Sequence, residues 1–434
     1  MTSVPSHDHD AKAQNISQDT GQNLWRSRLC RRTGSPNSVN IVAMYSLLPL
    51  TLRLSIVTFI CISCADPTTT DDQPMSPEVN VTDRDATPVE DIDAGSTQDM
   101  DSIDASGEYD NEVSPAEPDM TYRPPSYPSD DRMRVNHLQA LGTHNSYHLA
   151  PDIDFLPWNY SHLPLDEQLS IQGVRQFELD IFQNQAGAFD VYHILFADDR
   201  STCESLTTCL QVLKAWSDLN PGHHPLLVLI EPKSYLDPPD MVILKLNEVL
   251  EQTWGRSRLV TPQLLRRTYE NVRDSIRAEG WLTLGETRNR LIPILHTSGA
   301  LRAANLSFDG DEAGSLMLSD AYGNLEAPYA AYHSLNNPLT SQERIEAVVR
   351  ANHLVRTRAD SDGEESNAVD YQRAMVALAS GAHFISTDFP FPPTADTYGF
   401  VIPMGTPSRC NPISAPSDCS PEDIEALRPE EAAP

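Results

Sequence analysis

The segment 226–230, Leu-Leu-Val-Leu-Ile, is apolar at every position and ends at Glu231. A strand without polar alternation must be covered on both faces, as in a parallel sheet flanked by helices. Further strands are expected at 138–143, 174–182, 291–296, 315–318, 354–358 and 383–387. Helical patterns lie between them, at 205–219, 239–254, 269–279, 341–352 and 368–380.

This alternation predicts an α/β fold, a (β/α)8 TIM-type barrel over residues 131–402. Roughly 270 residues is a suitable length for one such barrel. A doubly wound sheet is the alternative. It is disfavoured because no glycine-rich phosphate loop follows the first expected strand.

The region before the barrel is strongly acidic. Residues 65–130 hold 18 Asp and Glu against two Arg, a net charge of −16 in a chain of net charge −31. Such a segment cannot bury enough apolar surface to offset the entropy of ordering, so we expect a disordered, self-repelling tether. Acidic proteins also bind nucleic acid poorly, and no nucleic-acid partner is expected.

A secretory signal is predicted at residues 44–64. Arg53 lies near the start of an apolar run whose body is 56–62, and the run ends in Ser63-Cys64-Ala65. This is the charged, apolar and small-residue order of a signal peptide, and the run is too short for a comfortable membrane span. The end resembles a bacterial lipobox, with Cys61 in place of the usual Leu. We therefore expect an exported lipoprotein of the outer or cell membrane, anchored at Cys64, with ordinary secretion as the alternative. Residues 1–43 stay unassigned and are expected to precede the true start at Met44.

Four cysteines follow Cys64: Cys203, Cys209, Cys410 and Cys419. Four thiols allow three connectivities, and proximity in the sequence favours Cys203–Cys209 and Cys410–Cys419. Neither spacing suits a zinc site, so disulfides in an oxidising compartment are expected. Residues 403–434 are rich in Pro, Ser and Glu and are expected to form a C-terminal tail held by the second disulfide.

Polar residues stand where the expected strands end. They are His144, Asn145, Glu178, Asp180, Glu231 and, thirteen residues past Asp180, His193. Glu178 and Asp180 are two apart on a strand and share a face. Because chemistry in such barrels belongs to the carboxyl ends of the strands, we expect these six side chains to converge.

This set suits metal-assisted cleavage of a phosphodiester. Three converging carboxylates repel one another and an anionic substrate, which a divalent cation would relieve. The oxygen ligands of Asn145, Glu178, Asp180 and Glu231 favour a hard ion, calcium or magnesium, over zinc. A bound cation also lowers the pKa of an attacking hydroxyl. The two histidines suit a general acid and a stabiliser of the pentacoordinate phosphorus.

These residues, in this order, resemble the catalytic barrel of the calcium-dependent phosphoinositide-specific phospholipase C family in its compact bacterial form, over about residues 135–400. The resemblance implies that His144 contacts the phosphoryl group and that His193 protonates the departing diacylglycerol oxygen. It implies Ca2+ rather than Mg2+ at Asn145, Glu178, Asp180 and Glu231. It also implies attack by the inositol 2-hydroxyl, which gives a cyclic phosphodiester.

Three basic residues are candidates for substrate binding. Lys233 shares a strand face with Glu231, and Arg356 and Arg358 end a later strand. For each, a salt bridge at the rim is the alternative. The scarcity of Lys favours plain phosphatidylinositol over highly phosphorylated head groups. The expected partner is thus a membrane phospholipid, bound by a monomer without the accessory domains of eukaryotic relatives.

Two other functions stay open. A glycerophosphodiester phosphodiesterase or sphingomyelinase-like barrel also uses two histidines and a Glu-x-Asp. That group usually has Arg after the first histidine and Asp after the second, where this chain has Asn145 and Ile194. A non-catalytic, surface-tethered binding module is the alternative from another class, and the intact histidines disfavour it.

Overall fold

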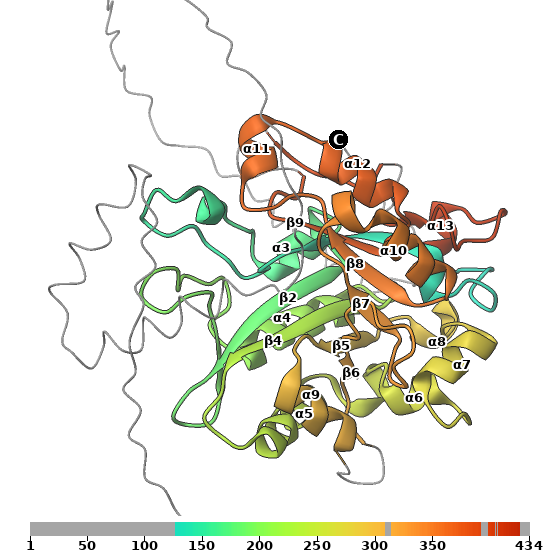
Figure 1. Cartoon of the computed structure of the whole chain (residues 1–434), viewed down its shortest axis with the longest axis horizontal. Helices are drawn as coiled ribbons and strands as arrows, with labels where there is room; N and C mark the ends of the chain where they lie inside the picture. The colour runs from blue at the N-terminus through green and yellow to red at the C-terminus, as the bar shows by residue number, and fades with distance from the viewer. Residues whose placement is uncertain (1–125, 309–313, 392–397, 404, 406, 426–434) are drawn as a thin grey trace, which may run out of the picture. The chain divides into compact units, whose positions relative to one another are not determined.

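The computed structural model describes residues 126–308, 314–391, 398–403, 405 and 407–425 (Figure 1). The predicted signal with Cys64, the unassigned residues 1–43 and nearly all of the predicted tether lie outside the described residues. In the part that is described, no helix is both long enough and apolar enough to cross a membrane.

Eight parallel strands form the barrel. They are β1 (Leu138–Thr143), β2 (Gln176–Gln183), β4 (Leu226–Ser234), β5 (Leu291–Leu295), β6 (Leu318–Ser319), β7 (Tyr332–Ser334), β8 (Leu354–Arg358) and β9 (Phe384–Thr387). Their order is β6-β5-β4-β2-β1-β9-β8-β7. The seam between β6 and β7 is closed by a parallel bridge between Asp320 and Tyr332. The predicted (β/α)8 barrel is confirmed.

Helices surround the strands in Figure 1. They are α3 (Leu165–Ser170), α4 (Leu206–Leu219), α5 (Pro239–Trp254), α6 (Pro262–Arg266), α7 (Val272–Glu279), α8 (Leu284–Thr287), α9 (Gly299–Ser307), α10 (Pro338–Arg350), α11 (Glu364–Ala368), α12 (Gln372–Ala379) and α13 (Pro421–Ile424). Local signals set their starts: the Ser205 hydroxyl accepts from the Thr208 N–H to cap α4, and Pro239 begins α5. The connection 320–331 between β6 and β7, all of it described, contains no helix.

The apolar run of β4 divides between two cores. Leu227 and Leu229 join a cluster with residues of the other barrel strands, in the barrel interior. Leu226, Val228 and Ile230 join a second cluster with residues of α4 and α5, outside the strands. Alternate side chains of a strand point to opposite faces, so a strand covered on both faces has no polar position until it ends.

Two features differ from expectation. β7 was not predicted, because Tyr332-His333-Ser334 is too short and too polar to give a strand signal. The described part of the expected C-terminal tail packs on the barrel. There β10 (Arg409–Cys410) pairs antiparallel with β1, and the buried Glu425 carboxylate binds the Arg175 guanidinium over 2.5 Å. Both predicted disulfides, Cys203–Cys209 and Cys410–Cys419, are present.

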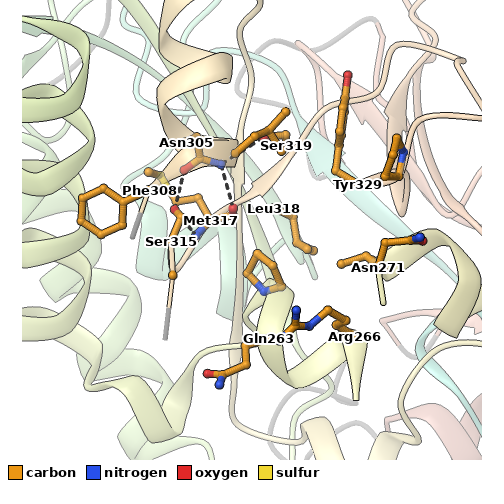
Figure 2. A pocket seen from close by; sticks show the side chains of 15 residues that line it. Gln263, Arg266, Asn271, Asn305, Phe308, Ser315, Met317, Leu318, Ser319 and Tyr329 are labelled. Carbon is orange, nitrogen blue, oxygen red and sulfur yellow. Dashed lines mark hydrogen bonds between the residues drawn. The ribbon is translucent and has the colours of Figure 1, made fainter. Parts of the chain in front are cut away.

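A cavity of about 660 Å³ opens between α6, α9 and the β6–β7 connection (Figure 2). Figure 2 shows Asn305 hydrogen-bonded to Ser315 and Ser319 on one side, with Gln263 and Arg266 on another. None of the predicted site residues lines this cavity. The functional site therefore lies elsewhere in the barrel.

Candidate active site

The interior of the barrel changes from apolar to polar toward the carboxyl ends of the strands. On β4 the inward positions run from Leu227 and Leu229 to Glu231 and Lys233. The equivalent change occurs on the other strands and gives His144, Glu178, Asp180, His296, Arg356, Arg358 and Asp388. Strand alternation thus directs these side chains into one end of the barrel.

The three predicted carboxylates meet on the neighbouring strands β2 and β4. Asp180 and Glu231 are register partners in this parallel pair. Oxygens of Glu178 and Glu231 and a ring nitrogen of His296 lie within 4.8 Å of one another, a geometry able to hold a metal ion. His296 directly follows β5 and was not among the predicted site residues. This group holds two of the three predicted acidic ligands, Glu178 and Glu231, and adds an imidazole. Asp180 is not part of it, although it is the register partner of Glu231.

Asn145 stands beside this cluster. The next residue, Ser146, hydrogen-bonds Glu178 twice: its N–H donates to the Glu178 carbonyl over 3.0 Å, and its hydroxyl accepts from the Glu178 N–H over 2.8 Å. Asn145 itself has a φ of +43°, a left-handed conformation that Asn tolerates better than most residues. Its amide nitrogen donates to the Tyr160 hydroxyl over 3.4 Å, and no described residue donates to its amide oxygen.

Each carboxylate also has a cationic neighbour. The fully buried Arg356 guanidinium pairs with Glu178 and donates to Asn336 and Ser386, each over 2.7 Å. The Lys233 ammonium lies 2.7 Å from Glu231 Oε1 and 3.3 Å from Asp180 Oδ2. The sequence left a rim salt bridge open as the alternative to substrate binding for Lys233 and Arg356. The structure shows such ion pairs, so the chain supplies part of the compensating charge itself.

The electrostatics of the cluster follow from these neighbours. Burial would raise the pKa of Glu178, but Arg356 above all, with His144 and His296, lowers it to about 2. Burial raises the pKa of Asp180 well above its ordinary value, and repulsion by Glu231 and Glu178 adds to this against the attraction of Lys233. Burial opposes protonation of His296, but Asp320 and Glu231 outweigh it and raise its pKa to about 9. Glu178 is thus ionised at neutral pH, whereas Asp180 holds a proton more readily than usual.

The residues fit a hard divalent cation. The oxygens of the buried Asp180 have the Lys233 ammonium 3.3 Å away but no well-formed hydrogen bond among the described residues, which is costly for a buried carboxylate. Asn145, Glu178, Asp180 and Glu231 offer the oxygen ligands that calcium prefers, and His296 adds a nitrogen next to Glu178 and Glu231.

Each predicted catalytic histidine is held by a buried aspartate. His144 Nδ1 lies 2.8 Å from Asp388 Oδ1, and His193 Nδ1 lies 2.7 Å from Asp198 Oδ2. The Arg358 guanidinium donates to the other oxygen of Asp388 over 2.8 Å. Although Asp388 is buried, His144 and Arg358 keep its pKa well below the ordinary value, so it is an acceptor and His144 Nδ1 must carry hydrogen.

Burial, reinforced by the Arg358 charge, lowers the pKa of His144 despite the attraction of Asp388. The ring is therefore neutral at neutral pH, with Nε2 left to take up a proton. The side chains of His144 and His193 are 22% and 24% exposed, so both rings reach the solvent side of the site.

One loop, residues 148–162, contacts both histidines. His162 Nε2 lies 2.9 Å from the carbonyl oxygen of His144. The Trp158 ring packs edge-on against His193 with centroids 5.9 Å apart. The loop thus links the first histidine, at the end of β1, with the second, which follows β3 (Phe189–Val191).

The three predicted substrate-binding residues are all ion-paired with carboxylates of the site. Lys233 pairs with Asp180 and Glu231, and Arg358 pairs with Asp388. Both side chains keep some exposure, 32% and 11%, and their substrate role stays a prediction. Arg356 has no exposed side-chain surface, so the structure does not support substrate contact and assigns it to holding Glu178.

Several functional candidates were missed from sequence: His296, Asp320, Asp388, Asp198 and His148. His296 and Asp388 directly follow β5 and β9, so the strand-end rule that found Glu231 could have found them. Asp320 follows β6, an expected strand, in the same way. Asp198 and His148 lie in loops, where no periodicity marks which side chain turns inward.

A barrel with two aspartate-held histidines beside a carboxylate cluster defines a metal-assisted hydrolase of phosphoric diesters. A family model described as phosphoinositide phospholipase C, Ca2+-dependent, matches residues 133–189 and 185–412. That is more than half of the chain, and it covers every residue of the candidate site. The protein belongs to the Ca2+-dependent phosphoinositide phospholipase C family.

Solved structures are similar at low identity. A calcium-dependent phosphoinositol-specific phospholipase C from a Pseudomonas species is 15% identical, with a TM-score of 0.47, over 65% of this chain and 97% of that one. A Ca2+-dependent phosphatidylinositol-specific phospholipase C from Streptomyces antibioticus is 16% identical, with a TM-score of 0.45, over 59% of this chain and 95% of that one. No protein with a curated description matches the chain. The family assignment therefore rests on the family model.

Proposed function

We propose that the protein is a calcium-dependent phospholipase C that cleaves phosphatidylinositol-type lipids. The inositol 2-hydroxyl attacks the phosphorus and gives its proton to a carboxylate of the ligand set, while the bond to the diacylglycerol oxygen breaks. Diacylglycerol departs, and the product is a cyclic inositol phosphate that can then be hydrolysed. The proposal is carried by two aspartate-held imidazoles, His144 and His193, in a chain of this family whose barrel also holds the metal-capable group of Glu178, Glu231 and His296, with Asp180 beside Glu231.

The geometry supports a role for each of these residues. Asn145, Glu178, Asp180 and Glu231 would hold the ion, which when bound offsets phosphoryl charge and lowers the pKa of the attacking hydroxyl. Nε2 of His144, left open by the hydrogen bond to Asp388, contacts the phosphoryl region. His193 presents its Nε2 to the leaving oxygen and protonates it. Arg356 keeps Glu178 ionised and in place.

An apolar rim beside His193 supports a lipid surface as the substrate. We define this rim by Ile194, Leu195 and Phe196, which are 42%, 51% and 84% exposed, and by Ile153, Phe155 and Leu156, which are 52%, 46% and 42% exposed. An antiparallel bridge between His148 and Ser201 and the Arg200–Asp152 ion pair join the two loops. Contiguous exposed apolar surface next to a site is typical of a membrane-contacting face.

Exchange of Phe196 for Ser is expected to weaken binding to phosphatidylinositol vesicles by about tenfold or more. A buried Phe side chain contributes roughly 1.5–3 kcal/mol, and about 1.4 kcal/mol corresponds to a factor of ten. Activity on a soluble, monomeric inositol phosphodiester should stay unchanged. Leu219→Ser is the matched control, because Leu219 is 73% exposed but lies at the end of α4, which leads to the opposite end of the barrel. Equal losses in both variants would reject the rim as the lipid contact.

The direct test is release of water-soluble inositol phosphate from phosphatidylinositol vesicles. We expect release that a calcium chelator abolishes and added calcium restores. Phosphatidylinositol 4,5-bisphosphate should be cleaved more slowly, because Lys233 and Arg358 are already ion-paired and leave little positive charge for ring phosphates. Cleavage of glycerophosphodiesters alone would instead indicate a glycerophosphodiester phosphodiesterase. No turnover of any of these substrates would favour a non-catalytic binding module.

We also propose that the protein is exported and lipid-anchored at Cys64. The support is the signal-like segment 44–64 and the two disulfides, which suit an oxidising compartment. Cys64→Ser should move the protein from the membrane fraction to the soluble fraction of the producing cells. A variant that stays with the membrane would show that Cys64 is not the anchor.

A further inference from the structure

The loop that carries His193 is a tight turn that folds back on itself. The Ile194 N–H donates to the Asp198 carbonyl and the Asp198 N–H donates to the Ile194 carbonyl, each over 2.8 Å. Phe196 sits at the tip with a φ of +66°. The turn returns the fully buried Asp198 carboxylate to the His193 ring, where Oδ2 lies 2.7 Å from Nδ1.

Asp198 serves a second imidazole as well. His148 Nε2 lies 2.8 Å from Asp198 Oδ1 and 3.0 Å from Oδ2. His148 is fully buried, and its other ring nitrogen, Nδ1, lies 3.0 Å from the Tyr160 carbonyl oxygen. A carbonyl and an ionised carboxylate can only accept, so Nδ1 donates to Tyr160 and Nε2 donates to Asp198. With hydrogen on both nitrogens, the His148 ring is an imidazolium paired with the Asp198 carboxylate. The Tyr160 ring stacks on His148 with centroids 4.2 Å apart and packs against the face of its ring.

The Asp198 carboxylate is thus set in place from two sides. Burial alone would raise its pKa, but the hydrogen bonds from His148 and His193 outweigh burial and keep the pKa below its ordinary value. An ionised carboxylate is an acceptor only, so His193 Nδ1 must carry hydrogen.

We propose that Asp198, held by His148, is the positioning residue for His193: it fixes hydrogen on Nδ1 and presents Nε2 to the leaving group. This inference rests on the proposed function. When the phosphorus–oxygen bond to diacylglycerol breaks, the departing oxygen takes the proton from Nε2. The imidazole is left neutral, with the Nδ1 hydrogen still donated to Asp198.

Asp198 is the charged group in direct contact with His193, and the charged His148 ring binds the same carboxylate. From its own turn His193 meets Asp198, and from the loop 148–162 it meets the rings of His148, 6.3 Å away, and Trp158. The next charged residues along the turn are engaged elsewhere: Asp199 accepts from the Phe196 N–H, and Arg200 pairs with Asp152. A change at Asp198 should therefore be felt by His193 directly.

Two variants and their combination test the proposal. Asp198→Asn is expected to lower kcat for phosphatidylinositol by about 10²–10⁴-fold, as loss of a tautomer-fixing carboxylate does in acid–base sites. The alkaline limb of the kcat/KM profile should move to lower pH, because the imidazolium form loses its carboxylate partner. His148→Gln should show a smaller loss of about tenfold, and the double variant should be no worse than Asp198→Asn, since both changes act through one carboxylate.

Glu425→Gln is the matched control. Glu425 is also a buried carboxylate paired with a cation, Arg175, but Arg175 directly precedes β2, at the opposite end of the barrel. This variant is expected to keep the wild-type pH profile whatever its stability. A shift of the alkaline limb in Glu425→Gln like that in Asp198→Asn would show a general effect of lost buried charge and overturn the proposal.

A second readout needs no turnover. In protein labelled with 15N-histidine, NMR should show a hydrogen-bonded Nδ1–H that disappears in His193→Ala and in Asp198→Asn. Absence of hydrogen from His193 Nδ1 in the wild-type protein would overturn the proposal even if the Asp198 variant fails to fold. Failure of the proposed function looks different: the Nδ1–H signal is present while phosphatidylinositol is not cleaved. If the losses of kcat in Asp198→Asn and His148→Gln add in the double variant, and the alkaline limb of the kcat/KM profile does not move, Asp198 has only a structural role.

Discussion

Exchange of His144 for Ala is expected to lower kcat/KM for phosphatidylinositol by about 10²–10⁴-fold, the usual contribution of a positioned acid–base group. His193→Ala should cost as much. The ring of each is oriented by a carboxylate through Nδ1, so the alanine variants lose an aligned Nε2 and not only a titrating group. Steady-state release of inositol phosphate at saturating calcium measures the effect.

The control for these variants lies on the same strand. His137 directly precedes β1, at the end opposite His144, and its Nδ1 accepts a hydrogen bond from the Arg134 N–H over 3.2 Å. His137→Gln keeps an acceptor there and is expected to leave kcat/KM unchanged. An unchanged rate in His144→Ala or His193→Ala would remove that residue from the mechanism.

Calcium affinity is expected to fall by about 10²-fold or more in Asp180→Asn, because even partners outside the ligand set typically cost 10–100-fold when removed. Asp180 is the carboxylate whose oxygens have no well-formed hydrogen bond among the described residues, so it has the most to gain from the ion. Because its pKa is raised, calcium competes with a proton for this carboxylate. Affinity should therefore rise with pH and fall as the pH is lowered.

Lys233→Met is expected to act in the opposite direction and tighten calcium binding by about tenfold. The Lys233 ammonium lies within 3.3 Å of both Asp180 and Glu231, where it repels an incoming divalent cation. Isothermal titration calorimetry in two buffers of different ionisation enthalpy would give the affinity and the released protons together. Weaker calcium binding in Lys233→Met would show that this lysine organises the ligands instead of competing with the ion.

The part of the site that sequence could predict depends on local rules. Glu178 and Asp180 share a face because strands alternate, and Glu231 was found because it ends an unbroken apolar run. Both rules depend on a few neighbouring residues. A parallel barrel then places the carboxyl ends of all its strands at one end, so the fold class alone predicts that these side chains lie close together. The eight-strand barrel could be predicted for the same reason, although β7 was too short to be seen.

The part that could not be predicted depends on contacts across the barrel. Arg356 was expected to face the substrate, but it pairs with Glu178. Arg356 is on β8 and Glu178 is on β2, and no local sequence pattern indicates a contact between residues so far apart in the chain. Asp198 is only five residues from His193, yet its role depends on a turn that folds it back. For Lys233 the sequence left substrate contact and a salt bridge open, because a shared strand face places it beside Glu231 but does not say which partner it takes.

Asp320 serves both the wall of the barrel and the site within it. Its backbone makes the bridge to Tyr332, while its carboxylate accepts from the Ser334 N–H over 3.1 Å and lies 2.8 Å from His296 Nδ1. Because the connection 320–331 contains no helix, it would be an obvious choice of loop for inserting a tag or peptide or for the new termini of a circular permutant. A change that displaces Asp320 would weaken the seam between β6 and β7 and remove the carboxylate that orients His296. Insertions and new termini in this scaffold should therefore be placed in another loop.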